Sequence, residues 1–180
     1  MRRLAVYCGS RHGHNPAFAA AARALGGSLV DHGVGLVYGA AGIGLMGVVA
    51  DAVLDQGGEV IGVIPECLHR DDVVHRRLSR LEVVEDMHQR KARMLELADG
   101  VVALPGGFGT LEELFEALSW LQMRLHEQPC GLLNVEGFFD PLLRFLDASV
   151  EQGFLTPRHR ALLRHHTDSD DLVRELLEHV

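Results

Sequence analysis

The sequence predicts an α/β protein in which a parallel sheet is covered by helices on both faces. Two observations support this prediction. Short apolar runs of strand length alternate along the 180 residues with longer segments whose apolar residues recur at helical spacing. Glycine-rich turns follow several of these runs and lead directly into the next helical segment. We therefore expect a single domain over residues 1–180, built on a Rossmann-like, doubly wound sheet.

The predicted elements follow one another in a regular order. The strands are the apolar runs at residues 4–8, 35–38, 59–64, 81–84, 101–104 and 131–135. The helices are expected at residues 16–31, 44–56, 87–98, 111–125, 141–152, 157–163 and 170–179. The polar stretch at residues 66–80 has no clean period, and we expect it to form a loop over the ligand site.

Composition and charge narrow the class of protein. Hydrophobic residues make up 47% of the chain and charged residues 23%, as in ordinary soluble globular proteins. The net charge of −8 argues against a general nucleic-acid binder, and no apolar run has the length of a membrane span. The three cysteines are an odd number without metal-ligand spacing, which favours reduced thiols. We expect a cytoplasmic protein whose partners include neither nucleic acid nor a membrane.

The most informative stretch joins the apolar run at residues 101–104 to the helix that follows it. Between them lie Gly106, Gly107 and Gly109, which allow backbone shapes that are closed to other residues. Thr110 is expected to cap the helix. A strand, a glycine loop and a helix N-terminus form an anion site, because free N–H groups and the positive end of the helix dipole meet there. We interpret the loop as a phosphate site rather than as a simple connecting turn.

A second glycine motif, Gly42-x-Gly44-x-x-Gly47, matches the dinucleotide-binding fingerprint by its spacing. It follows the second predicted strand rather than the first. The acidic residue expected about twenty positions later, at the end of the next strand, is missing. These two departures disfavour an NAD-dependent oxidoreductase.

Taken in this order, the motifs resemble those of the LONELY GUY family, the cytokinin riboside 5′-monophosphate phosphoribohydrolases that are often labelled lysine decarboxylases. The resembling signature is Pro105-Gly106-Gly107-x-Gly109-Thr110-x-x-Glu113. The other matching segments are Cys8-Gly9-Ser10, Gly42-Ile43-Gly44-Leu45-Met46-Gly47, Met87-His88-Gln89-Arg90-Lys91-Ala92 and Gly131-Leu132-Leu133-Asn134. The resemblance extends over residues 4–152. Family members usually have three glycines where this chain has Gly39-Ala40-Ala41, and two added methyl groups are expected to narrow the approach to this turn.

Two charged residues lie near the starts of their helices. Arg90 shares a helix face with Met94 and carries paired donors for phosphate or hydroxyl groups, although its spacing fits a solvated surface charge equally well. Glu113 lies in the first turn of its helix, where the dipole favours the ionised form, and we expect both side chains to be exposed. A carboxylate there suits stabilising a cationic sugar, holding ribose hydroxyls or orienting a water. The alternative is a carboxylate that merely complements the dipole.

The resemblance implies that Arg90 and Glu113 are catalytic and that Lys91 lies in the substrate site. It places Ser10 in the first phosphate-side loop, and it makes Ser119 a further substrate contact because the family often has threonine there. The implied reaction is cleavage of the N-glycosidic bond of a purine nucleoside 5′-monophosphate to free base and ribose 5-phosphate. The sequence leaves open whether the base is a prenylated adenine, adenine or another purine. The alternative is a non-catalytic nucleotide-binding or carrier module of the same fold.

Two other kinds of chemistry are disfavoured by the residues. Lys91 is the only lysine of the chain, so a pyridoxal-phosphate decarboxylase would need it as the Schiff base. It follows Arg90, however, in a helix start that suits anions. The eleven histidines include no His-x-x-x-His pair near a cysteine or carboxylate in ligand spacing, so we expect no metal and no cofactor.

The central helix carries apolar residues on two sides. The face expected to pack on the sheet consists of Leu111, Leu114, Phe115, Leu118, Leu121 and Leu125. Trp120, Met123 and Ala117 fall on the far side, together with Glu113. One domain of this size leaves little chain to cover them, unless the C-terminal helices fold back over Trp120. We expect a homodimer through this far side, with the active site beside the interface.

Overall fold

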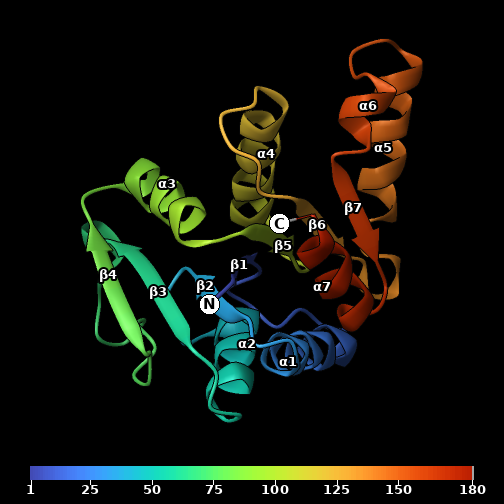
Figure 1. Ribbon diagram of the computed structural model, residues 1–180. Helices are drawn as coiled ribbons and strands as arrows, with labels where there is room; N and C mark the ends of the chain where they lie inside the picture. Colours follow the sequence, from blue (N-terminus) through green and yellow to red (C-terminus); the bar gives the residue numbers. More distant parts are fainter. Residues whose placement is uncertain (180) are drawn as a thin grey trace.

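A central sheet of seven parallel strands organises the computed structural model, which describes residues 1–179 (Figure 1). Across the sheet the order is β4 (Arg80–Val84), β3 (Val60–Pro65), β2 (Gly35–Tyr38), β1 (Arg3–Tyr7), β5 (Gly100–Ala103), β6 (Cys130–Leu133) and β7 (Leu163–His166). All neighbouring strands run parallel. Apart from the added edge strand β4, this is the strand order of a Rossmann sheet, so the predicted fold class is confirmed.

Helices cover both faces of the sheet, as Figure 1 shows. One face carries α1 (Pro16–Asp31), α2 (Gly44–Leu54) and α7 (Ser169–Glu178). The other carries α3 (Met87–Leu97), α4 (Phe108–Gln122) and α5 (Asp140–Glu151). The short elements are η1 (Glu66–Leu68), η2 (Val135–Gly137) and α6 (Pro157–Arg160). Within residues 1–179, no helix is both long and apolar enough to span a membrane.

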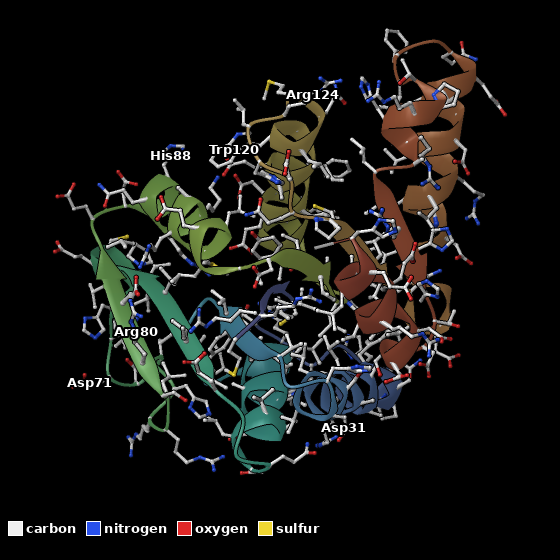
Figure 2. The ribbon with its side chains drawn as sticks, in the orientation of Figure 1. Asp31, Asp71, Arg80, His88, Trp120 and Arg124 are labelled. Atoms are coloured by element: carbon white, nitrogen blue, oxygen red, sulfur yellow. The ribbon has the colours of Figure 1, made fainter. Side chains whose placement is uncertain are left out.

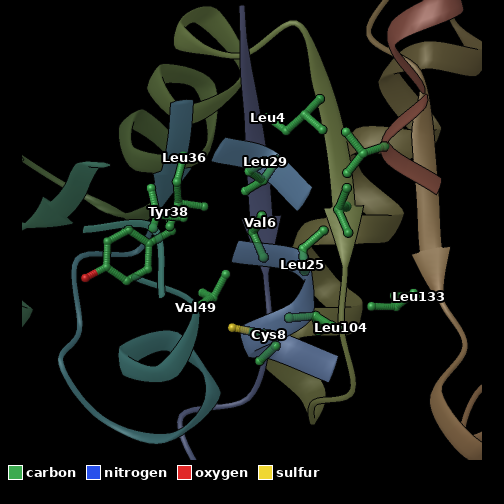
Figure 3. Close-up of a cluster of buried hydrophobic side chains, with 14 of the residues drawn as sticks. Leu4, Val6, Cys8, Leu25, Leu29, Leu36, Tyr38, Val49, Leu104 and Leu133 are labelled. Carbon is green, nitrogen blue, oxygen red and sulfur yellow. The ribbon is translucent and has the colours of Figure 1, made fainter. Parts of the chain in front are cut away.

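The strands are nearly all apolar because both faces of the sheet are buried. In β1, Leu4 and Val6 belong to the hydrophobic cluster shared with α1, α2 and α7, part of which is drawn in Figure 3. Ala5 and Tyr7 belong to the cluster shared with α3 and α4. Continuous apolar runs are the expected pattern for such doubly covered parallel strands.

The two loops that carry the conspicuous motifs meet at one place. β1 lies between β2 and β5, where the strand order reverses. The carboxyl ends of β1 and β5 are therefore adjacent, and the backbone N–H of Gly9 donates to the carbonyl of Pro105 at 3.1 Å. Sheets of this type bind ligands at such a switch point, outside the carboxyl ends of the strands.

The structure moves the start of the central helix. α4 begins at Phe108 with Gly107 as its N-cap, so Thr110 lies inside the first turn and the prediction that it caps the helix is wrong. A glycine cap satisfies the backbone geometry without occupying the helix N-terminus with a side chain. The first N–H groups of α4 therefore have no side-chain acceptor within the described part of the chain and can donate to a group outside the helix.

The strand β7 was not expected. The helix predicted at residues 157–163 ends at Arg160, and Leu163–His166 then pairs with β6. Its sequence, Leu-Arg-His-His, has one apolar residue and gives no strand signal by itself. An edge strand is half solvated, and here the unpaired edge of β6 supplies the backbone partners.

α4 packs on the sheet through a different side from the one expected. Its buried residues are Thr110, Glu113, Leu114 and Ala117, whereas Leu111 and Leu118 are half-buried against α5. The helix is thus rotated, and Glu113 and Ala117 from the side that was assigned to a partner molecule are buried, whereas Met123 from that side stays exposed. Trp120 is half-buried in the cluster that α3 and α4 share, and Figure 2 shows it on the side of α4 that faces α3.

The loop between β3 and β4 folds onto the turn that follows β2. The N–H of Gly42 donates to the carbonyl of Val73, and the N–H of His75 donates to that of Ala40, both at 2.8 Å. Ala40 has a φ of 64°, in the left-handed region that its Cβ disfavours. The two hydrogen bonds hold this strained turn in place.

Candidate functional site

The start of α4 is open toward a cavity. Among residues 1–179, no side chain caps this helix. Gly107 and Gly109 face space in which an added Cβ would meet nothing within 4 Å. A Cβ on Gly106 would come within 2.0 Å of the Thr110 hydroxyl, so this glycine lets the loop lie against the buried threonine. Free N–H groups, the helix dipole and open space are the features that an anion site requires.

A cavity of about 300 Å³ lies at this helix start. Of the predicted site residues it brings together Ser10, Arg90, Gly107, Gly109, Thr110 and Glu113. Gly106 lines an adjoining cavity of about 430 Å³, which shares Gly107 and Ser10 with the first. The sequence argument did not single out Tyr7, Cys8, Gly39, Met46, Met87 and Phe108 as lining residues. Their position inside or directly beside the glycine and Met-His motifs was the available signal.

Arg90 is held at the start of α3 with donors to spare. Asp86 caps the helix by accepting a hydrogen bond from the N–H of Gln89 at 2.8 Å, as predicted. The Nη2 atom of Arg90 lies 3.4 Å from Oε1 of Glu113, and Nη1 lies 3.6 Å from the sulfur of Met87. Its Nε is buried and has no partner among residues 1–179. Arg90 also lines the cavity, so its guanidinium offers charged donors to a ligand there.

Gly39, at the end of β2, makes room for this guanidinium. A Cβ added to Gly39 would lie 1.9 Å from Nη2 of Arg90 and 2.7 Å from the Cε of Met46. Any side chain there would displace the arginine from Glu113. The turn that follows, with Ala40 and Ala41, does not reach the cavity lining among the described residues, so its two methyl groups act at a distance from the ligand space.

Glu113 is buried rather than exposed, and so is Arg90, with 9% and 8% of each residue accessible. The expectation of exposed placement is therefore wrong for both. Burial raises the pKa of Glu113, and the guanidinium of Arg90 opposes this rise. The pair thus places a largely buried carboxylate and its counter-charge at the wall of the cavity.

Two predicted residues lie away from the cavity. Lys91 is 4% exposed, and its ammonium pairs with Glu112 and with Glu116 of α4, the latter at 2.8 Å. Ser119 lies about three helical turns beyond the start of α4. It is exposed and lines a separate pocket of about 90 Å³ toward α5 and α6. The structure of one chain does not bring either side chain into the ligand cavity.

The second glycine motif serves packing between loops. A Cβ on Gly44 would come within 2.2 Å of the Ser10 backbone, and one on Gly47 within 2.6 Å of the carbonyl oxygen of Gly42. The N–H of Leu45, at the start of α2, already donates to the carbonyl of Gly9 at 3.0 Å. This helix start is consequently engaged by protein, in contrast to the start of α4.

We expect replacement of Glu113 by glutamine to stabilise the protein at neutral pH. A carboxyl whose pKa is raised in the folded state costs no stability below its unfolded value near 4.5 and destabilises increasingly as the pH rises through the folded pKa. Each pKa unit is worth about 1.4 kcal/mol. The free energy of unfolding from urea titrations should therefore be higher for Glu113→Gln than for wild type at pH 7. The difference between the two should disappear at about pH 4. The exposed Glu178→Gln serves as control, and a less stable Glu113→Gln at pH 7 would contradict the prediction.

Comparison with known proteins places the chain in a family. The family model described as "Possible lysine decarboxylase" matches residues 46–176. The chain is 44% identical over 178 residues to the cytokinin riboside 5′-monophosphate phosphoribohydrolase LOG7 of Arabidopsis thaliana, covering 99% of this chain and 82% of that protein. It is 46% identical over 179 residues to the phosphoribohydrolase LOG of Oryza sativa subsp. japonica, covering 99% and 74%.

Two solved structures share the fold at low sequence identity. The molybdenum cofactor binding protein of Rippkaea orientalis superposes with a TM-score of 0.75 at 19% identity, covering 98% of this chain and 96% of that one. The Moco carrier protein of Chlamydomonas reinhardtii gives 0.73 at 21%, covering 99% of both. These likenesses show the fold alone. The sequence relatives and the shared motifs decide the family: the chain belongs to the LONELY GUY family, as its motifs indicated.

Proposed function

We propose that the protein hydrolyses the N-glycosidic bond of a purine nucleoside 5′-monophosphate, releasing free base and ribose 5-phosphate. The observation that carries this proposal is the buried pair of Arg90 and Glu113, 3.4 Å apart, beside an uncapped helix start. The names of the relatives, cytokinin riboside 5′-monophosphate phosphoribohydrolases, support a nucleotide with an N6-substituted adenine, as in cytokinin biosynthesis. AMP carries the same 5′-phosphate, ribose and N-glycosidic bond to adenine, so it serves as a test substrate.

In this proposal the phosphate accepts hydrogen bonds from the first N–H groups of α4. Ser10 and Thr110 line the same cavity and contribute to the phosphate site. That anchor sets the ribose over Arg90 and Glu113. Cleavage of a glycosidic bond passes through an oxocarbenium-like sugar, which the carboxylate of Glu113 stabilises. Water orientated by Glu113 adds to C1′ and loses a proton, while the base leaves with the bonding electron pair and, in the balance of the reaction, takes up that proton. Arg90 holds the phosphoribosyl part through its unused donors.

A lysine decarboxylase is not supported by the site. Burial would lower the pKa of Lys91, but its ion pairs with Glu112 and Glu116 outweigh this and raise it. A Schiff-base lysine needs the opposite, a neutral amine that faces its cofactor. Lys91 is charged, paired with two carboxylates and absent from the described residues that line the cavity.

We further propose a homodimer that forms through the outer side of α4. Trp120 packs within its own subunit, so the exposed residues of this side are Phe108, Glu112, Ser119 and Met123, with Leu125 just beyond the helix. Phe108 is 95% exposed and Met123 58%. Exposed apolar residues beside a ligand cavity suit a subunit interface, whose rim is ordinarily polar. A second copy there would also cover Ser119, which one chain leaves outside the site.

The three free thiols support a cytoplasmic location, because the cytosol keeps cysteines reduced.

We expect Arg90→Ala and Glu113→Gln each to lower base release from AMP by about a thousand-fold, because each removes a charge aimed at the reacting sugar. The fold should persist, as judged by circular dichroism. Matched controls are Arg174→Ala and Glu178→Gln, exposed residues of α7 on the opposite face of the sheet. Free base is measured by chromatography. Release near the wild-type rate in either site variant would exclude the catalytic assignment and favour a non-catalytic carrier.

The 5′-phosphate should be required for efficient cleavage. The 5′-phosphate binds at the start of α4, and this binding energy positions the ribose over the reacting groups. Adenosine has no phosphate and therefore loses this contribution. We expect kcat/KM for AMP to exceed that for adenosine by at least about a thousand-fold, measured with the same base-release assay. Equal values for the two substrates would show that the glycine loop is only a turn.

For the dimer, we expect light scattering to give twice the mass of the chain, and Met123→Glu to give a monomer, because a buried unpaired carboxylate is costly at an interface. Leu68→Glu, at an exposed apolar residue of η1, is the control and should remain dimeric. A monomeric wild-type mass at micromolar concentration would rule the interface out.

A further inference from the structure

Lys91 joins the two helices that carry the catalytic pair. It follows Arg90 on α3, and its ammonium lies between Glu112 and Glu116 of α4. Glu112 in turn precedes Glu113. The chain therefore places two ion-pair contacts directly behind the contact between Arg90 and Glu113, all of them between the same two helices.

Lys91 does not face the ligand. The cavity is lined by Arg90, Glu112 and Glu113, whereas Lys91 and Glu116 stay outside its lining within residues 1–179. Only 5% of the Lys91 side chain is exposed. One oxygen of Glu116 is buried without a partner in the same part of the chain, so Lys91 is the charge that compensates this carboxylate.

We propose that Lys91 is a positioning residue, which holds Arg90 against Glu113 by tying α3 to Glu112 and Glu116 of α4. This inference rests on the proposed function and deepens it. It replaces the substrate contact that the family resemblance implied for Lys91. Reacting groups tolerate little displacement, since a shift of about 1 Å can cost a hundred-fold in rate.

Lys91 also shapes the charge around Glu113. From α3, Arg90 and Lys91 favour its ionised form, while Glu112 and Glu116 on its own helix disfavour it. From β1, it is faced by Tyr7 and Cys8, and burial raises the pKa of each of these groups, so both are neutral at pH 7. Removing Lys91 leaves two uncompensated carboxylates, and the pKa of Glu113 must rise further.

The decisive variant is Glu116→Gln, because Glu116 does not line the cavity. We expect Glu116→Gln and Lys91→Met each to lower kcat for AMP by about ten- to a hundred-fold with little change in KM. The double variant Lys91→Met/Glu116→Gln should be no worse than Lys91→Met alone, since it removes both buried charges together and leaves the exposed Glu112 solvated. Lys91→Arg, which keeps the cation, should recover much of the rate. A wild-type kcat in Glu116→Gln, or a loss confined to KM in Lys91→Met, would overturn the proposal.

A second measurement separates this proposal from the reaction itself. Carbon NMR of the side-chain carboxyl groups, without any nucleotide, gives the pKa of Glu113 in wild type, Lys91→Met and Lys91→Arg. We expect Lys91→Met to raise this pKa, and the acidic limb of the activity profile to move up with it, while Lys91→Arg stays near wild type. An unchanged pKa in Lys91→Met overturns the proposal. If the wild-type protein releases no base from AMP, the proposed function is wrong. The NMR measurement does not depend on the reaction, so it tests the effect of Lys91 on the pKa of Glu113 in either case.

Discussion

The contact between Arg90 and Glu113 is the interaction on which the rest of the site depends. It joins two helices that cover the same face of the sheet, and it lies where β1 and β5 end side by side. The glycines around it have a common purpose, which is to let backbone and side chains approach. Gly39 makes room for the guanidinium, and Gly106 makes room for Thr110 beside the helix start.

Burial gives this pair its chemistry and its cost. A carboxylate in low dielectric interacts strongly with a developing cation, yet it must stay ionised to do so. Arg90 in front and Lys91 behind supply the compensating charges, while Glu112 and Glu116 balance Lys91. The site is therefore a small network in which each charge lies against at least one charge of opposite sign.

Two glycine-rich helix starts in one chain have different roles. The start of α2 donates to the carbonyl of Gly9 and so fixes the loop that carries Ser10. The start of α4 is left open to the cavity. The same fold occurs in molybdenum cofactor carriers at about 20% identity, with TM-scores of 0.73 to 0.75. The fold alone therefore does not specify a function, and our proposal rests instead on the residues of the site, Arg90 and Glu113 above all.

The sequence by itself determined the parallel sheet, six of its strands, the capped start of α3 and the glycine loop before α4, because these depend on local periodicity and glycine placement. The tertiary structure decided the rest. β7 forms because it pairs with the free edge of β6. The rotation of α4 about its axis is set by its packing on the sheet. Lys91 points toward α4 because it pairs there with the carboxylates of Glu112 and Glu116. A helical wheel gives the angles between side chains but no direction toward the core. That direction comes from contacts between distant segments, which no local pattern contains.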